Sequence, residues 1–249
     1  MATALFSFHG ELVEFLPRAR RGGAFSHSCA RAATIKNAIE SLGVPHTETG
    51  RLTVNGQPAT LSRIVREADA IEVFPRHAAD APTGEVPLFI ADAHLGGLAR
   101  LLRMLGFDTL FENAYADRRI LELAARERRV LLTRDRELLK CRDVCRGCFV
   151  HARKPEAQLN EVVARYALAR YLRPFTLCLH CNLRLEAAEP GAVAARVPQP
   201  IAARYAQFAR CPGCERIYWE GSHWAHMREM LGPVLAECVK YRPSRATTP

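Results

Sequence analysis

Apolar and polar residues alternate in short blocks over the N-terminal third of the chain, which predicts a small α+β unit. The segments 5–8 and 12–16 read as two short strands on either side of Gly10. Residues 33–42 carry apolar side chains at helical spacing, and Gly43 provides a left-handed cap where that helix ends. We therefore expect two strands followed by one amphipathic helix.

The same unit continues with a hairpin signal and a last strand. Leu52-Thr53-Val54 runs into Asn55-Gly56, a dipeptide typical of tight turns between antiparallel strands. Residues 70–74 alternate again, and Pro75 ends them because proline cannot donate to a strand ladder. Two strands, a helix and further strands in this order are typical of a β-grasp fold.

The middle of the chain alternates between short apolar runs and segments with helical spacing. A segment with the composition of a linker, 76–86, precedes it. Strands alternating with helices predict a parallel sheet that is covered on both faces. The predicted strands are 87–91, 108–111, 130–133 and 148–150, and the predicted helices are 95–105, 117–124, 136–140 and 156–172.

Composition excludes several classes of protein. Hydrophobic residues make up 49% of the 249 positions and charged residues 24%, so the chain is not disordered throughout. No apolar run approaches the roughly 18 residues of a membrane span. The first residues lack the basic and apolar regions of a secretory signal. We expect a cytoplasmic protein without a membrane partner.

The net charge of +9 is unevenly distributed. Residues 1–85 hold nine basic and nine acidic side chains, so the whole excess lies in 86–249. Such an excess indicates a polyanionic partner, with nucleic acid as the first candidate and no specificity for DNA inferred. Arg accounts for 31 of the 35 basic residues, which suits phosphate binding but is equally explained by genomic base composition.

Acidic residues follow the predicted strands of the parallel sheet. Asp92 and Asp135 come just after two of them, and Asp117 opens the helix after another. Ligands bind at the carboxyl edge of such sheets, and converging carboxylates suit Mg²⁺ or Mn²⁺. An Asp between strand and helix is also a good N-cap, so spacing alone leaves capping and metal binding both open.

Two CxxC pairs lie 29 residues apart in the C-terminal third, and they predict a closed four-thiolate zinc site of structural type. The alternatives are free thiols or a redox dithiol. Three further cysteines and His151 offer a weaker second metal site, although ordinary cysteines are the simpler interpretation. The CxxC cysteines are Cys178, Cys181, Cys211 and Cys214, and the further three are Cys141, Cys145 and Cys148.

Aromatic residues follow the second CxxC pair. Tyr218, Trp219 and Trp224 lie beside Arg216 and Arg228, a combination that can stack on RNA bases. Packing between the zinc-binding lobe and the helix that follows is the alternative, and we favour it.

Several stretches, in order along the chain, carry a family resemblance. They include Phe-Ile-Ala-Asp, Leu-Leu-Thr-Arg-Asp, Arg-Pro-Phe-Thr, Cys-Pro-Gly-Cys and Tyr-Trp-Glu-Gly-Ser-His-Trp. With them, residues 88–231 resemble the Mut-seven-C type RNase domain family, regarded as a PIN-like nuclease fold with a zinc ribbon. The matching stretches are 89–92, 95–109, 131–139, 173–176, 211–214 and 218–224.

The resemblance implies hydrolysis of RNA phosphodiester bonds with Mg²⁺ or Mn²⁺. It makes Asp92 and Asp135 the first metal-binding acids and Asp117 the third, and Arg103 and Arg134 become candidates for phosphate contact. The family tends to be acidic after the third Asp, whereas this chain has Arg118-Arg119. That departure favours the alternative, a non-catalytic RNA-binding or adaptor protein with the same fold.

The N-terminal unit, through residues 39–48 and 54–56, resembles ubiquitin-like β-grasp domains of the ThiS/MoaD sulfur-carrier type. Those carriers need a C-terminal Gly-Gly, but here the chain continues past Phe74-Pro75-Arg76, and Gly22-Gly23 lies inside a loop. We therefore expect a module that binds a protein partner or positions RNA.

The prediction as a whole is an α/β protein of three domains. A ubiquitin-like β-grasp domain covers 1–78, a PIN-like parallel sheet flanked by helices covers 87–172, and a zinc ribbon with a terminal helix covers 173–235. The predicted function is a metal-dependent ribonuclease with structural zinc.

Overall fold

The computed structural model describes residues 1–77 and 85–221, together with Ala225, Glu229 and Gly232. The chain divides into two compact units, and each is described by itself. Most of the predicted linker and nearly all of the predicted terminal helix after Gly221, including Trp224 and Arg228, lie outside the described residues. None of the described helices combines the length and apolar character needed to cross a membrane.

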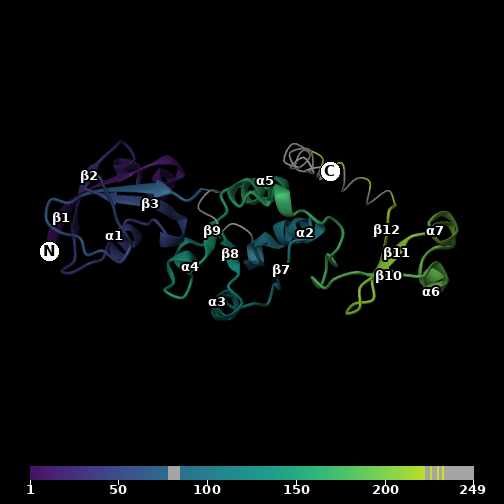
Figure 1. Ribbon diagram of the computed structural model, residues 1–249. Coiled ribbons are helices and arrows are strands. Elements are labelled where there is room, and N and C mark those ends of the chain that lie inside the picture. The colour runs from purple at the N-terminus through teal and green to yellow at the C-terminus, as the bar shows by residue number, and fades with distance from the viewer. Residues whose placement is uncertain (78–84, 222–224, 226–228, 230–231, 233–249) are drawn as a thin grey trace, which may run out of the picture. The chain divides into compact units, whose positions relative to one another are not determined.

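The first unit begins with the five-stranded sheet of a ubiquitin-like β-grasp region, in the order β2-β1-β5-β3-β4 (Figure 1). β1 pairs antiparallel with β2 and parallel with β5, while β3 pairs antiparallel with β5. The helix α1 is capped by Thr34, whose side chain accepts the N–H of Asn37. The strands are β1 Ala2–Phe8, β2 Phe25–Cys29, β3 Thr49–Val54, β4 Gln57–Pro58 and β5 Ala70–Pro75, and α1 is Ile35–Ser41.

The predicted strand at 12–16 is wrong. This segment is the 3-10 helix η1, Gly10–Phe15, and the second strand of the sheet is β2. Leu12, Phe15 and Leu16 are all buried, and a spacing of three and four residues places them on one face of a helical turn. The apolar residues of this segment therefore follow the helical period rather than that of a strand. Two further 3-10 turns are η2 Arg18–Arg20 and η3 His46–Glu48.

The hairpin signal is confirmed. Asn55 and Gly56 both have positive φ, 52° and 77°, as expected for the two central residues of the tight turn that joins β3 to β4. The helix over 33–42 is confirmed as α1, and Gly43 follows it with φ of 96°.

The second sheet has four strands in the order β7-β6-β8-β9, and helices flank it. β8 and β9 run parallel, with Leu131 opposite Gly147 and Thr133 opposite Phe149. The strands are β6 Phe89–Ala91, β7 Thr109–Leu110, β8 Val130–Thr133 and β9 Gly147–Phe149. The helices are η5 Ala93–Leu95, α2 Gly96–Met104, α3 Asp117–Arg126, α4 Arg136–Lys140, α5 Pro155–Arg165 and η6 Leu168–Tyr171.

The helix predicted over 156–172 is shorter than expected. α5 ends at Arg165, and Ala167 has φ of 47°, in the left-handed region that breaks a helix. The chain then continues as η6. Apolar spacing persists through this break, which explains why the pattern predicted one helix.

The C-terminal part of the second unit is a three-stranded antiparallel sheet in the order β10-β11-β12. Its buried core consists of only Val193, Val197 and Phe208 among the described residues, with half-buried side chains such as Trp219 packed against it. Such a small core needs additional cross-links to be stable. The elements are β10 Glu186–Ala188, α6 Pro190–Val193, η7 Ala194–Arg196, α7 Gln199–Arg204, β11 Phe208–Arg210 and β12 Ile217–Trp219.

Candidate metal centre and acidic site

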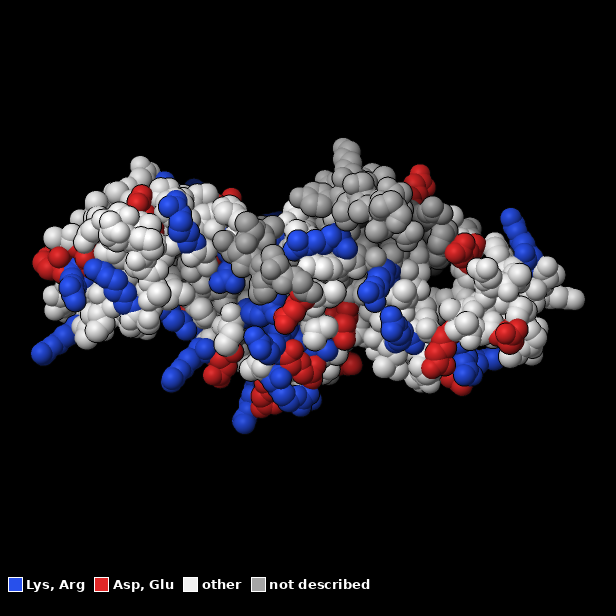
Figure 2. Space-filling model, in the orientation of Figure 1, with Lys and Arg blue, Asp and Glu red and all other residues white. Residues whose placement is uncertain are grey.

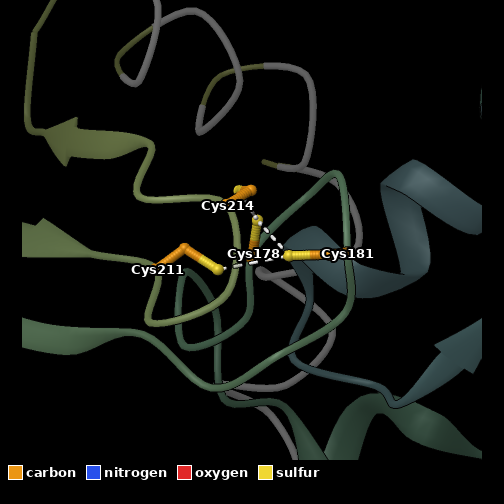
Figure 3. A group of neighbouring side chains, drawn as sticks. All are labelled: Cys178, Cys181, Cys211 and Cys214. Atoms are coloured by element: carbon orange, nitrogen blue, oxygen red, sulfur yellow. Dashed lines mark hydrogen bonds between the residues drawn. The ribbon is translucent and has the colours of Figure 1, made fainter.

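The four CxxC cysteines converge on one point in the second unit (Figure 3). Their sulfur atoms lie within 4.8 Å of one another, and neighbouring pairs are 3.2 to 3.5 Å apart. A tetrahedral ion with metal–sulfur bonds of about 2.3 Å places its thiolates about 3.8 Å apart. The cysteines therefore fit such an ion after spreading by a few tenths of an ångström, and the four-cysteine cluster can bind a metal such as zinc.

The two CxxC turns have the same backbone geometry. In the first, Asn182 N–H donates to Cys178 O and Cys178 N–H donates to Leu183 O. In the second, Glu215 N–H donates to Cys211 O and Cys211 N–H donates to Arg216 O. The residue after the second cysteine is left-handed in both turns, with φ of 64° at Asn182 and 56° at Glu215. Each turn thereby presents two thiols to the same side.

Hydrogen bonds prepare Cys178 for metal binding. Burial opposes its ionisation, but the N–H groups of Cys181 and His180 and the hydroxyl of Tyr218 outweigh that effect and lower the pKa of Cys178 to about 6. The oxygen of Tyr218 lies 3.1 Å from the sulfur. Burial and then the neighbouring sulfur atoms raise the pKa of Cys181 to about 12. The low pKa favours the thiolate form of Cys178, which is the form that binds a metal ion, and metal binding must displace the protons that remain on the other thiols.

Arg103 is buried, only 4% exposed, and it holds the first CxxC turn. Its guanidinium donates to the carbonyl oxygens of Leu179 and His180 at 3.1 and 2.6 Å and to Thr109 O at 2.9 Å. The sequence suggested Arg103 as a phosphate ligand. In the structure its side chain reaches from α2 to the first CxxC turn, where it donates to backbone carbonyl oxygens.

Asn182 makes a second connection between this turn and the strand β7. Its side-chain oxygen accepts the N–H of Thr109 at 3.0 Å, and its amide nitrogen donates to Asp108 Oδ1 at 2.6 Å. The first CxxC turn is therefore fixed to the RNase-like part of the second unit by two side chains, Arg103 and Asn182.

Asp92 and Asp135, which lie in the first unit, are connected through Thr133. The Thr133 hydroxyl donates to Asp92 Oδ2 at 2.8 Å and accepts the N–H of Asp135 at 2.9 Å. Asp92 is 8% exposed and its other oxygen accepts the N–H of Ala93. Asp92 N–H donates to Leu132 O, which places the two acidic residues at the ends of neighbouring strands.

Asp135 also caps a helix. Its Oδ1 accepts the N–H of Glu137 at 2.8 Å, and α4 begins at the next residue. The capping role that the sequence left open is therefore present, on a residue that is exposed to solvent. One carboxylate oxygen is engaged by the helix and the side chain remains accessible.

Asp117 and Asp135 both lie close enough to Cys141 for their charges to affect the pKa of its thiol. Burial, and then the negative charges of Asp143, Asp117, Asp135 and Glu137, raise the pKa of Cys141. In the described part of the chain, however, only the four-cysteine cluster brings three or more metal-ligand atoms within 4.8 Å. Asp92, Asp117 and Asp135 thus lie in one acidic region without forming a preassembled three-carboxylate site.

Arginines near this region contact backbone carbonyls and Glu122. Arg134 donates to the carbonyl oxygens of Val150 and His151 at the end of β9. Arg118 and Arg119 both pair with Glu122, at 3.1 and 3.6 Å, along the exposed face of α3. Both arginines therefore share one carboxylate on α3.

The remaining candidates are the aromatic residues after the second CxxC pair and the three cysteines near His151. Tyr218 contacts Cys178, and Trp219 packs on the small C-terminal core, whereas most of the helix that was expected to pack there lies outside the described residues. His151 packs against Phe149. The thiols of Cys141, Cys145 and Cys148 do not form a ligand group with it among the residues that the structure covers.

Sequence reasoning missed three residues of these sites, namely Thr133, Asn182 and the bonding role of Tyr218. Thr133 stands two positions before Asp135, at the last position of its strand, where a hydroxyl can reach the sheet edge. Asn182 directly follows Cys181 of the cluster, a position where Asn tolerates a left-handed backbone. The residue types at these positions were the only features of the sequence that could have indicated these roles.

Comparison with known proteins identifies two family models. The Mut7-C RNAse domain matches residues 87–231, more than half of the chain, and the Mut7-C ubiquitin domain matches residues 1–80. No curated protein matches this sequence. Among solved structures, small archaeal modifier protein 1 of H. volcanii matches 30% of this chain and 98% of its own, with 17% identity and a TM-score of 0.25. By the match over 87–231, this chain belongs to the Mut7-C RNAse domain family.

Proposed function

We propose that this chain is a cytoplasmic metal-dependent ribonuclease that hydrolyses phosphodiester bonds of RNA. In this proposal a PIN-like domain over 87–172 carries the chemistry, a zinc ribbon over 173–235 stabilises it, and the β-grasp domain spans 1–78. The observation that supports it best is the pairing of Asp92 and Asp135 through the Thr133 hydroxyl at the ends of neighbouring strands.

The acidic residues suit Mg²⁺ or Mn²⁺ held partly through water. Mg²⁺ usually retains several waters and binds one or two carboxylates directly, so it does not require three preassembled ligands. Bound there, such an ion activates water and neutralises charge in phosphodiester hydrolysis. Asp92 and Asp135 would hold it, Asp117 would contribute from the start of α3, and Thr133 orients Asp92. No side-chain nucleophile is required.

The four-cysteine cluster suits a structural zinc. Four thiolates close the coordination shell, so no position remains for substrate. The three-residue core of this lobe makes metal a major source of its stability.

RNA is the proposed partner because of the family match and the positive charge of 86–249. Figure 2 shows Lys and Arg side chains spread along the visible face, with acidic side chains among them. The proposal therefore rests on the acidic residues rather than on one basic patch.

The test compares cleavage of labelled single-stranded and structured RNAs in Mn²⁺ and in EDTA. Asp92→Asn and Asp135→Asn should abolish Mn²⁺-dependent cleavage. Asp143→Asn is the matched control, because Asp143 is exposed in the same acidic region but lies on the loop after α4. Equal cleavage by all variants would reject the assignment of the acids.

A non-catalytic RNA-binding adaptor is the second candidate. The three carboxylates are not preassembled, and Arg118-Arg119 follows Asp117, which weakens the negative field there. Salt-dependent RNA binding without cleavage, unaffected by Asp92→Asn, would favour this function.

A further inference from the structure

The β-grasp region contacts the part of the RNase domain that belongs to the same unit, through the 3-10 turn η3. Three consecutive residues of this turn face the strand β9 and the loop before it. We propose that the β-grasp domain is an internal clamp of the RNase domain, which seals the edge strand β9 and fixes the helix α4 that carries Asp135. The part concerning Asp135 rests on the proposed function.

Glu48 supplies the first contact. β9 is the last strand of its sheet, and Val150 N–H donates to Thr133 O of the neighbouring strand. The preceding amide, Phe149 N–H, therefore points away from the sheet, where it donates to Glu48 Oε1 at 2.7 Å. Glu48 is 1% exposed, so a buried carboxylate of the β-grasp domain terminates the strand edge.

His46 and Thr47 complete the contact with β9 and with the loop before it. His46 Nε2 lies 2.9 Å from Val144 O, and its Nδ1 lies 2.6 Å from Glu40 Oε1. A Cβ atom on Gly147 would lie 3.2 Å from Thr47 Cγ2 and 2.5 Å from a methyl carbon of Leu139. Glycine at this position thus permits the turn to lie directly on the strand.

Arg136 connects the β-grasp region to α4. It is the first residue of that helix, and its guanidinium stacks over Phe15 at 4.9 Å and over Phe149 at 5.6 Å. It also donates to Phe15 O at 3.2 Å. Because Asp135 is the preceding residue and the N-cap of the same helix, the β-grasp domain sets the position of its carboxylate.

The first experiment measures amide hydrogen exchange in the full chain. Glu48→Ala should accelerate exchange over 134–151 by roughly tenfold, because the Phe149 amide loses its acceptor. Glu48→Gln should restore protection, since its amide oxygen can accept the same bond. Glu72→Ala is the control, because Glu72 lies on β5 and bonds to Thr53 within the β-grasp sheet.

The second experiment keeps the proposal testable if Glu48→Ala does not fold. Arg136→Lys retains the charge but loses the planar stack, so it should accelerate exchange over the same segment. It should also weaken Mn²⁺ binding about tenfold, measured by electron paramagnetic resonance, with an unchanged melting temperature.

Unchanged exchange over 134–151 in both Glu48→Ala and Arg136→Lys would overturn the clamp. A wild type that binds no Mn²⁺, combined with faster exchange in these variants, would support the clamp and reject the proposed nuclease chemistry. The two proposals can therefore fail separately.

Discussion

The guanidinium of Arg103 donates a hydrogen bond of 2.6 Å to the carbonyl oxygen of His180, inside a turn that carries two of the four clustered cysteines. Replacing this buried residue by Met removes bonds to three carbonyl groups. We expect Arg103→Met to lower the free energy of unfolding by about 2–4 kcal/mol, measured by chemical denaturation of the zinc-loaded protein. We also expect a chelator to remove zinc faster.

Arg100→Met is the matched control for this change, because Arg100 lies on the same helix and is exposed. It should leave both measurements nearly unchanged. If instead Arg103→Met were stable but lost RNA affinity, the phosphate-binding role suggested by the sequence would be favoured.

Thr133 permits a separate test of the acidic residues. Thr133→Val preserves the shape of the side chain but removes the hydroxyl that bonds to Asp92 and to the Asp135 amide. We expect a loss of stability of about 1–3 kcal/mol and the loss of Mn²⁺-dependent cleavage. Thr133→Ser should restore both, and a fully active Val variant would contradict the role given to the hydroxyl.

The two left-handed residues of the CxxC turns form a natural pair of variants. Glu215→Ala should leave the free energy of unfolding nearly unchanged, because glutamate already carries the Cβ atom that disfavours this conformation and its ion pairs are exposed. Asn182→Ala should cost about 1–3 kcal/mol more, because it also removes the bonds to Thr109 and Asp108. Thermal unfolding of the two variants provides the comparison, and equal losses would show that the Asn182 side chain contributes nothing.

Metal removal should make the stability of the protein depend on pH. Folding lowers the pKa of Cys178 to about 6 from an ordinary value of 9.0, so its thiolate stabilises the folded state increasingly from pH 6 to 9. The pKa of Cys181 is raised to about 12, so its contribution is lost as the pH rises above 9. In EDTA and a reductant, the melting temperature should therefore rise up to about pH 9 and then fall.

Tyr218→Phe checks the cause of this pH dependence. Without the hydroxyl that bonds to Cys178, the pKa of this thiol moves back toward its ordinary value and the rise between pH 6 and 9 becomes smaller. An identical pH profile in the variant would assign the effect to other groups.

Most elements could be predicted because local patterns determine them. The apolar spacing of α1 and the Asn55-Gly56 turn need no distant partner, and the CxxC spacing anticipates that the four sulfur atoms converge. The error at 12–16 arose because a five-residue apolar segment fits the period of a strand and that of a helix equally well. In the structure the helical turn is the form that buries both Leu12 and Phe15.

The role of Arg103 could not be predicted, because it depends on contacts with residues more than 70 positions away. An arginine in a positively charged segment suggests phosphate contact until its burial is known. Asp135 was undecided for a similar reason. Its capping bond is local, whereas its relation to Asp92 passes through Thr133 and requires the pairing of two strands.

The attachment of the first CxxC turn by Arg103 and Asn182 bears on the order of assembly. One half of the metal centre is positioned by the RNase-like part of the chain, whereas the other half follows after 29 intervening residues. For the second CxxC turn to reach a metal ion on the first, the 29 intervening residues must close into a loop. The entropic cost of closing a loop of 29 residues is on the order of 3 kcal/mol. A nascent chain would complete this centre late, only after Cys214 has been synthesised. Binding of the ion by all four cysteines would then depend on the preceding part having folded.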